Sequence, residues 1–354
     1  MALRWITRHG SKRSGFRYTD PDGRPVRDRR TLARIGILRV PPAWHNVHIA
    51  ASPATAVQAW GIDAKGRKQY RYHTKAVEQG NRRKYYRVRS MARDLPRIRQ
   101  ALLHDFRRDD LSRQHVAAGA VRFLNDGFFR VGSDRYMKEN RTFGLTTLRT
   151  RHAAVNGDAI TFAYIGKLGV RQRKVITDHE LARFVRALQR APGARLFRDR
   201  NRHGQWCDLS ARDVNEYVRE ITGHRYTAKD FRTWGGTLRF ATVLAELGAP
   251  EAVYARKKNV VLATRLVAAE LGNTPTICRQ SYVHPILIAR YLDEGATIAL
   301  RLVHARQRPS SIAHTPEELA LIRFLDKHFP ERRRHHRPDE LAPSDDRTAG
   351  PAAA

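Results

Sequence analysis

Cysteine is almost absent from this sequence, with Cys207 and Cys278 alone among 354 residues and far apart from each other. Zinc sites and redox centres need closely spaced ligands, and neither cysteine belongs to such a group. Carboxylates form no short Asp-x-Asp cluster, and His335-His336 lies in a predicted tail. These absences argue against a dedicated metal site, and they predict two free thiols in a reducing cytoplasm.

Long apolar runs are also missing, since no segment approaches the roughly 20 residues that cross a membrane. The basic N-terminal stretch MALRWITRHGSKRSG lacks the apolar core of a secretion signal. The stretch GIDAKGRK, which begins at Gly61, approaches a phosphate-binding loop but lacks the Gly-Lys-Ser/Thr that such a loop requires. We therefore expect a soluble, intracellular protein with no membrane partner and no cofactor, ATP included.

Negative charge is scarce relative to positive charge. The chain carries 67 Lys+Arg against 34 Asp+Glu, a formal net charge of +33 at pH 7. Because neutralising phosphates releases condensed counterions, the expected partner is a polyanion, and nucleic acid is the commonest such partner. A solvated basic surface is the plainer alternative. Hydrophobic residues make up 41% of the chain, enough for two ordinary cores. The charged residues are therefore expected on the surface of a folded protein.

The spacing of apolar residues divides the chain into regions. Short β-like runs alternate with turn residues at first, which predicts a small β-rich domain over residues 1–80. The stretch QGNRRKYYRVRS is interpreted as a polar, basic connector, and beyond it the helical period predominates. We expect a larger, mainly helical domain over residues 81–330 and a disordered tail over residues 331–354, which lack apolar periodicity.

Helices and one sheet can be placed in the larger domain. Core-facing helices are predicted by apolar residues at helical spacing: Ala117, Val121, Leu124 and Phe128 in one, and Leu181, Phe184, Val185 and Leu188 in another. Two capping-box patterns, Ser210-x-x-Asp213 and Thr227-x-x-Asp230, predict helix starts.

Between the first two helices, turns at Asn156-Gly157 and Leu168-Gly169 separate three β-like runs, LTTLRTRHAAV, ITFAYIGK and VRQRKVI. These runs predict a three-stranded antiparallel sheet with Lys167 at its second bend. The expected fold class is therefore α+β.

Four side chains that suit phosphate chemistry flank the predicted elements: Arg130, Lys167, Arg232 and Tyr282. Each has an ordinary explanation alone, since arginine and lysine are usually solvated and a helical tyrosine usually lies in a core. Their surroundings are more specific. The ordered stretches RVGSDRYMKENRTFGLTTL, YIGK, KDFRTWGGT and GNTPTICRQSY resemble the catalytic domain of type IB DNA topoisomerases, in the small branch found in poxviruses and bacteria. The resemblance extends from about residue 20 to about residue 310.

The resemblance implies a catalytic role for each matching residue. Tyr282 would be the nucleophile that forms a 3′-phosphotyrosyl link and frees a 5′-hydroxyl. Arg130 and Arg232 would hold the nonbridging phosphate oxygens, for which the planar fork of arginine is suited. Lys167 would protonate the departing 5′-oxygen as general acid. Asn273 stands where the poxvirus enzyme has histidine, and its amide can donate a hydrogen bond but cannot carry a proton.

The activity implied is relaxation of supercoiled DNA without ATP or metal, because one phosphodiester is exchanged for another. Residues 81–330 would be the catalytic domain and residues 1–80 a DNA-binding domain. In the family, the β segment that corresponds to residues 61–73 contacts DNA. The candidate contacts there are Lys65, Arg67, Lys68, Gln69, Tyr70 and Tyr72, although one of the tyrosines could instead belong to a core. Tyr136 and Lys138 would contact phosphates near Arg130.

We expect a monomer that closes around duplex DNA like a clamp. Arginine is strongly preferred over lysine and alanine is abundant, which suggests a GC-rich bacterial genome, and so the cytoplasm, at the nucleoid.

The segment around Tyr282 is predicted to be a helix that starts near Thr274 and Pro275. Pro285 follows closely, and two interpretations remain open. A proline inside a helix clashes with the carbonyl of the preceding turn, here that of Ser281, which would free Tyr282 to move. Alternatively, Pro285 only ends one helix before another begins.

Two rival functions are considered. A tyrosine site-specific recombinase shares the phosphotyrosine step, but recombinases usually carry His-x-x-Arg around the second arginine, where this chain has Lys229. Their N-terminal domains are also helical rather than β-rich. A non-enzymatic basic DNA-binding protein would explain the charge but not a tyrosine, a lysine and two arginines at motif positions.

Overall fold

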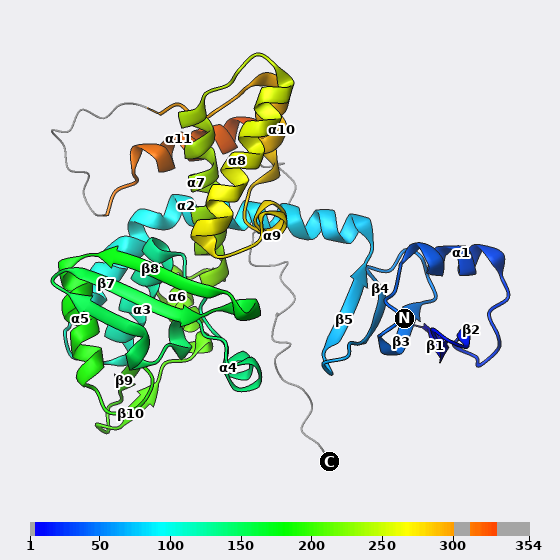
Figure 1. The fold of residues 1–354 in the computed structure, drawn as a ribbon, viewed down its shortest axis with the longest axis horizontal. Coiled ribbons are helices and arrows are strands. Elements are labelled where there is room, and N and C mark those ends of the chain that lie inside the picture. The colour runs from blue at the N-terminus through cyan, green and yellow to red at the C-terminus, as the bar shows by residue number, and fades with distance from the viewer. Residues whose placement is uncertain (1–3, 301–311, 331–354) are drawn as a thin grey trace. The chain divides into compact units, whose positions relative to one another are not determined.

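The computed structural model describes residues 4–300 and 312–330 (Figure 1). The chain forms two compact units, Met1–Lys84 and Tyr85–Ala354, and the boundary between them falls within helix α2 (Thr74–Phe106). The first unit is built on an antiparallel sheet, and the second is mainly helical with a three-stranded antiparallel sheet. The predicted α+β class is confirmed. The predicted tail, residues 331–354, lies outside the described residues.

The first unit is a five-stranded antiparallel sheet covered by one helix. Its small core contains Ile6, Val47, Ile49 and Ala59 from the sheet and Ile35 from the helix. Because successive strand residues point to opposite faces, the neighbours of these core residues lie on the other face of the sheet. The strands, in the sheet order β2-β1-β3-β4-β5, and the helix are β1 (Trp5–Ser11), β2 (Gly15–Thr19), β3 (His45–Ala50), β4 (Val57–Ile62), β5 (Lys68–Tyr72) and α1 (Arg29–Ile37).

The predicted connector QGNRRKYYRVRS is wrong, because these residues lie inside α2, a helix of 33 residues. Tyr85, Val88, Ala92 and Leu95 are buried and recur at helical spacing, so one face of the helix packs into the core of the second unit. Of the basic residues that suggested a connector, Arg82 and Arg83 are exposed, whereas Arg89 is buried. Lysine, arginine and glutamine are good helix formers, so a polar surface does not prevent a helix.

The sheet of the second unit has the strand order β6-β7-β8, with α3 and α5 packed against it. The predicted hairpin is present: Asn156 pairs with Ala159, and Gly157 adopts a left-handed conformation with φ 56°. The first strand is shorter than predicted, since residues 145–152 form two short turns before it. These elements are η1 (Leu145–Thr147), η2 (Thr150–His152), β6 (Ala153–Asn156), β7 (Ala159–Ile165), η3 (Lys167–Gly169) and β8 (Arg171–Thr177).

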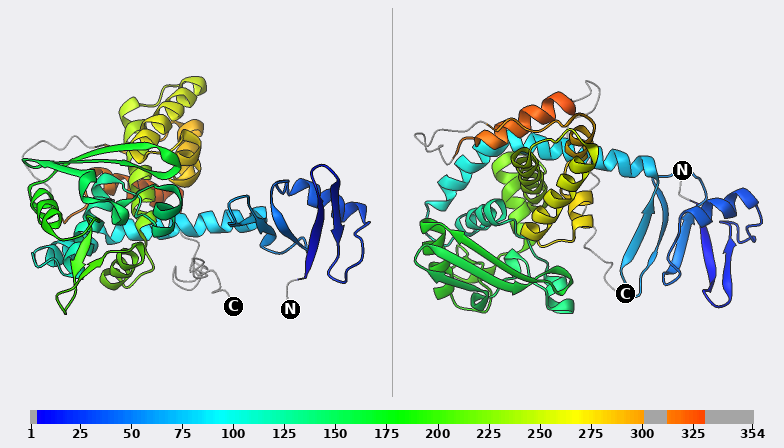
Figure 2. Two further views of the ribbon diagram at one scale, coloured as in Figure 1. Left: turned by 60° about the horizontal axis from the view of Figure 1, so that its bottom comes forward. Right: turned by 45° about the horizontal axis from the view of Figure 1, so that its top comes forward.

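The helices of the second unit share one large core with this sheet. Helix α8 packs against α7, α9 and α10, and the views in Figure 2 show α7, α8 and α10 lying side by side. Both predicted capping boxes begin helices, at Ser210 before α6 and at Thr227 before α7. The remaining elements are α3 (Arg113–Gly127), α4 (Asp134–Asn140), α5 (His179–Arg190), β9 (Arg198–Arg200), β10 (Trp206–Asp208), α6 (Ala211–Thr222), α7 (Ala228–Leu247), α8 (Val253–Leu271), α9 (Pro275–Ser281), α10 (Pro285–Glu294) and α11 (Pro316–His328).

Candidate active site

Arg130 is held by backbone pairing between two parts of the first motif. The carbonyl of Arg130 accepts a hydrogen bond from the N–H of Leu145 at 2.8 Å. The two segments touch so closely that a Cβ on Gly144 would lie 2.6 Å from the Cα of Gly132. The glycines of RVGSDRYMKENRTFGLTTL therefore allow a close backbone contact, and this contact fixes the position of Arg130.

Arg232 lies in the second turn of α7, where only 3% of its surface is exposed. Its Nη1 donates to the carbonyl of Phe128, and its Nη2 donates to the carbonyl of Leu271 at 2.9 Å. The Phe128 carbonyl is available because α3 ends there, with Phe128 in a left-handed conformation. Burial lowers the pKa of Arg232, but a guanidinium keeps its charge at any working pH.

The C-terminus of α8 ends in a Schellman motif. Gly272 adopts φ 60°, and its N–H donates to the carbonyl of Ala269 at 3.1 Å. The N–H of Asn273 donates to the carbonyl of Ala268 at 2.8 Å. These two bonds leave the carbonyls of residues 270–272 without partners in the helix, at the end where the helix dipole is negative.

Each of these three carbonyls accepts a hydrogen bond from one cationic side chain: Glu270 from Lys174 at 3.0 Å, Leu271 from Arg232 at 2.9 Å, and Gly272 from Arg130 at 3.0 Å. The cations come from three separate parts of the chain, β8, α7 and the segment after α3. The end of α8 thus collects positive charges that would otherwise repel one another.

Asn273 completes this cluster. Its Oδ1 accepts a hydrogen bond from Nη2 of Arg130, which orients the amide. Its Nδ2 is buried and, among the described residues, has no hydrogen-bond partner. The same is true of Nε of Arg232. Buried donors without partners are rare in proteins, so two of them beside several cations indicate a binding site for an anion.

Tyr282 lies just after a helix rather than within one, contrary to the prediction. Helix α9 ends at Ser281, and Tyr282 is its C-terminal cap. Two hydrogen bonds hold the following backbone: Thr237 Oγ1 donates to the carbonyl of Tyr282 at 2.8 Å, and the Tyr85 hydroxyl donates to the carbonyl of Val283 at 2.7 Å. The tyrosine therefore sits in a short, fixed segment between two helices.

Two adjacent glycines in α7 allow this helix to pack closely against Tyr282 and Phe128. A Cβ on Gly236 would lie 3.2 Å from the Cβ of Tyr282 and 3.1 Å from Leu271. A Cβ on the preceding Gly235 would overlap the ring of Phe128 at 2.0 Å. The adjacent glycines of KDFRTWGGT thus permit α7 to approach both neighbours.

The structure distinguishes the two interpretations of Pro285. Thr274 caps α9 and Pro275 occupies its first turn, as predicted. Pro285 is likewise in the first turn of α10, capped by His284. At that position a helix needs no amide donor from the proline. The interpretation that Pro285 distorts a helix at Tyr282 is wrong, and the alternative, that Pro285 separates two helices, is confirmed.

Electrostatics distinguish Tyr282 from a second tyrosine near the same arginines. Burial raises the pKa of Tyr282, but the positive charges of Arg232, Arg130 and Lys229 outweigh it, so this pKa lies below its ordinary value. The guanidinium carbon of Arg232 lies 5.1 Å from the centroid of the Tyr282 ring. At Tyr164, burial dominates and raises the pKa to about 12. Of the two phenols, only Tyr282 is prepared to carry negative charge.

Lys167 is not part of this cluster. It lies in η3, the exposed connection between β7 and β8, and its ammonium group makes no hydrogen bond or ion pair with any residue that the structure describes. Its neighbour Leu168 is in a left-handed conformation and is 83% exposed. The structure therefore brings together Arg130, Arg232, Asn273 and Tyr282, but leaves Lys167 in solvent.

Three of the predicted DNA contacts of the first unit, Lys68, Tyr70 and Tyr72, alternate along β5 and so lie on one face of its sheet. Tyr70 and Tyr72 stack with their centroids 5.8 Å apart, and neither belongs to a core, so the core alternative is wrong. Lys68 lies over the ring of Trp60, with Nζ 3.8 Å from the centroid.

The turn before β5 holds the other candidates. Arg67 and Gln69 both donate to the carboxylate of Asp63, and Lys65 is exposed at the tip of the turn. Hydrogen bonds from Arg67 are the largest influence on the pKa of Asp63, which lies below its ordinary value. The side chains of Arg67 and Gln69 are thus fixed in place, while the exposed side chain of Lys65 can contact a phosphate.

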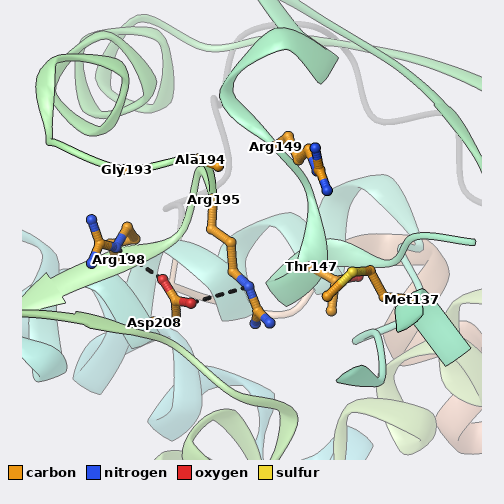
Figure 3. A pocket seen from close by; sticks show the side chains of 8 residues that line it. All are labelled: Met137, Thr147, Arg149, Gly193, Ala194, Arg195, Arg198 and Asp208. Atoms are coloured by element: carbon orange, nitrogen blue, oxygen red, sulfur yellow. Dashed lines mark ion pairs between the residues drawn. The ribbon is translucent and has the colours of Figure 1, made fainter. Parts of the chain in front are cut away.

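Tyr136 and Lys138 are exposed on the short helix α4. Its first residue, Asp134, pairs with Arg195, which also pairs with Asp208 at 3.2 Å. Figure 3 shows Arg195 and Arg198 turned toward Asp208 at the edge of a pocket that Arg149 also lines. Salt bridges therefore anchor α4, although the structure shows no contact of Tyr136 or Lys138 with Arg130.

Sequence reasoning missed several residues near the cluster, namely Lys174, Lys229 as a charge acting on Tyr282, Tyr164, Thr237 and Tyr85. No motif marked Lys174, which shares one face of β8 with the buried Gln172. The others are brought to the site by packing between distant segments, for which no local motif exists.

Two further findings concern the described residues only. None of their helices combines the length and the apolar character that a membrane crossing demands. No group of three or more His, Cys, Asp or Glu side chains among them is arranged to hold a metal ion. Cys207 is exposed, Cys278 is buried, and both are free.

Comparison with known families agrees with these motifs. Residues 68–304 match the family described as Eukaryotic DNA topoisomerase I, catalytic core, and residues 15–63 match Bacterial DNA topoisomerase IB, N-terminal domain. DNA topoisomerase 1B of Acanthamoeba polyphaga mimivirus is 31% identical over 259 residues, which cover 71% of this chain and 77% of the relative.

Poxvirus proteins are more distant relatives. DNA topoisomerase I of Monkeypox virus and DNA topoisomerase 1B of Vaccinia virus (strain Copenhagen) are each 26% identical over 244 residues, 66% of this chain and 72% of each relative. The resemblance predicted from the motifs is confirmed.

Proposed function

This chain belongs to the type IB DNA topoisomerase family, and from that premise we propose that it relaxes supercoiled DNA through a transient single-strand break joined to Tyr282. The observation that carries the proposal is the cluster at the end of α8. It combines Arg130, Arg232 and Asn273, two buried donors without described partners, and a tyrosine with a lowered pKa. A phosphodiester with its nonbridging oxygens in the cluster would satisfy both donors.

Cleavage is an exchange of phosphodiester bonds. The Tyr282 oxygen gives up its proton to solvent and attacks phosphorus, a P–O bond to tyrosine forms, and the P–O bond to the 5′-oxygen breaks. Arg130, Arg232 and the Asn273 amide stabilise the charge on the nonbridging oxygens while this happens. The covalent intermediate keeps the DNA 3′ end on the enzyme. The reverse reaction reseals the strand, so neither ATP nor a metal ion is needed.

Lys167 supplies the remaining proton. An alkoxide is a poor leaving group, and an ammonium that protonates the 5′-oxygen in the transition state accelerates its departure. Because Lys167 is exposed on the β7–β8 connection, bound DNA is the partner that brings it to the reacting bond. Strand rotation between cleavage and resealing then releases supercoils.

The first unit supplies affinity rather than chemistry. Lys65, Lys68, Tyr70 and Tyr72 on and beside β5 bind the duplex, with Tyr136 and Lys138 of α4 adding phosphate contacts. Phosphate contacts of this kind position a protein on DNA and weaken steeply with salt. We propose a monomer whose two units close around the duplex, acting at the nucleoid of a bacterial cell.

The direct test is relaxation of supercoiled plasmid in EDTA without ATP, comparing the wild type with Tyr282→Phe. Tyr254→Phe serves as a matched control, since Tyr254 is 69% exposed on α8. We expect relaxation by the wild type and the control, none by Tyr282→Phe, and unchanged DNA affinity in all three.

A detergent quench should leave protein on the 3′ end of the broken strand in the wild type and in Tyr254→Phe, but not in Tyr282→Phe. Relaxation that needs magnesium, or that survives in Tyr282→Phe, would contradict the mechanism. DNA binding with no relaxation by any variant would instead favour a non-enzymatic DNA-binding protein.

A further inference from the structure

Lys174 is a third cation at the end of α8 that the catalytic set inferred from the family motifs does not include. It lies on β8, partly buried, and its Nζ donates to the Glu270 carbonyl at 3.0 Å. The same ammonium lies 5.5 Å from the centroid of the Phe129 ring. Lys174 thus donates a hydrogen bond to one of three adjacent backbone carbonyls. Arg232 and Arg130 donate to the other two.

Among the described residues, the charged groups that act on Lys174 lie on α7, on α8 and in the segment after α3. Arg232 and Arg130 repel its charge, and Glu270 attracts it. The Glu270 carboxylate is already engaged, since its Oε1 accepts a hydrogen bond from Arg239 at 2.9 Å. Burial first, and then the two arginines, lower the pKa of Lys174 to about 8.

Of the three cations, Lys174 alone can lose its charge near physiological pH, because arginine stays protonated. When it is charged, Lys174 strengthens the attraction for a phosphate held by Arg130 and Arg232. When it is neutral, its hydrogen bond to the Glu270 carbonyl weakens, since bonds from charged donors are the stronger ones. That carbonyl belongs to the same turn that ends in Asn273, so the charge also affects how firmly Asn273 is held.

We propose that Lys174 is a positioning residue of the DNA-cleavage site, whose charge holds the end of α8 and Asn273 against the scissile phosphate and makes cleavage sensitive to pH. This inference rests on the proposed function. A phosphodiester that enters the cluster adds negative charge near Lys174 and stabilises its protonated form. DNA binding at a pH where Lys174 is half-charged is therefore accompanied by proton uptake.

The first experiment measures single-turnover cleavage of a duplex well below saturating concentration, where the rate reports the protonation state of the free enzyme. The pH is varied between about 6.5 and about 9.5, a range that spans the titration of a lysine perturbed by burial. Wild type is compared with Lys174→Met, which keeps the length of the side chain without its charge, and with Lys174→Arg, which keeps the charge. Because Tyr282 titrates in all three proteins, the ratio of wild-type to variant rate isolates Lys174.

We expect Lys174→Met to be slower by about tenfold near pH 7, roughly the effect of one favourable charge interaction, and to match the wild type within about twofold above pH 9. Lys174→Arg should keep its charge across this range, so the ratio of its rate to the wild-type rate should rise at high pH. A wild-type to Lys174→Met ratio that stays constant with pH would mean a merely structural lysine and would overturn the proposal.

A second measurement begins without a Lys174 variant and requires no cleavage. In the Tyr282→Phe background, which binds DNA without cutting it, calorimetry in buffers of different ionisation enthalpy reports the protons taken up on binding near pH 8. We expect uptake, and its loss when Lys174→Met is added. No uptake would overturn the proposal. If the wild type cleaves no DNA, or Tyr282→Phe still cleaves it, the proposed function fails rather than the role of Lys174.

Discussion

The end of α8 and the connection between β7 and β8 carry the two kinds of residue that this chemistry needs, and they are organised in opposite ways. At the end of α8, Arg130 and Arg232 are bound to backbone carbonyls, and Arg232 is almost fully buried. On the β7–β8 connection, Lys167 is exposed and makes no polar contact with the described residues. In the proposed mechanism, the phosphate clamp therefore exists before DNA arrives, whereas the proton donor is not yet placed.

Burial, and after it repulsion from the arginines, explains the difference. A lysine inside the cluster has difficulty keeping its proton, as the lowered pKa of Lys174 shows. Arginine tolerates the same surroundings because its intrinsic pKa is far above the working pH. A general acid is therefore better kept away from the arginines until the phosphate has offset their charge.

Among the substitutions that test the contrast between the end of α8 and the β7–β8 connection, those at Arg232 should have the largest effect. Arg232→Ala should lower single-turnover cleavage by about 1,000-fold, because it removes a preorganised donor from the transition state. It also leaves the carbonyls of Phe128 and Leu271 unpaired, which should cost roughly 1–3 kcal/mol of folding stability. Cleavage kinetics and thermal melting measure both. Arg212→Ala, an exposed arginine on α6, is the control, and a similar loss there would remove the distinction.

Lys167→Ala should have a smaller effect on cleavage, about 100-fold, and none on the melting temperature. A substrate with sulfur in place of the 5′-oxygen separates the role of Lys167 from that of Arg232, since a thiolate leaves without protonation. We expect this substrate to restore Lys167→Ala to near the wild-type rate but not to restore Arg232→Ala. Equal rescue of both variants, or of neither, would refute the separation of clamp and acid.

Gly236→Ala tests how closely Tyr282 is held to α7. The added Cβ lies 3.2 Å from the Cβ of Tyr282, so the tyrosine must move by a few tenths of an ångström. Small misplacement of a reacting group is costly, and we expect cleavage to fall by about tenfold with DNA affinity unchanged. Gly36→Ala in α1 is the matched control, because nothing lies within 4 Å of its added Cβ. An unchanged rate for Gly236→Ala would mean that the position of Tyr282 is set elsewhere.

Much of the fold was predictable from local pattern. Capping boxes at Ser210 and Thr227, the hairpin at Asn156-Gly157 and the core-facing helix residues depend on the chemistry of a few neighbouring residues, and the structure confirms them. The stretch QGNRRKYYRVRS was wrongly predicted to be a connector, because polar and basic residues in a helix resemble those of a linker. Pro285 was ambiguous for a similar reason, since the same residue can break a helix or begin one.

By itself, the sequence determined the family, the residue types of the site and the basic charge that suits DNA, because motifs and composition are properties of the chain. The tertiary structure decided which residues meet. Three carbonyls at the end of one helix draw together cations from β8, α7 and the segment after α3. The same packing places Lys174 among the arginines, leaves Lys167 outside and separates the pKa of Tyr282 from that of Tyr164. Burial and distance between groups far apart in sequence set these properties, and neither is encoded in a local pattern.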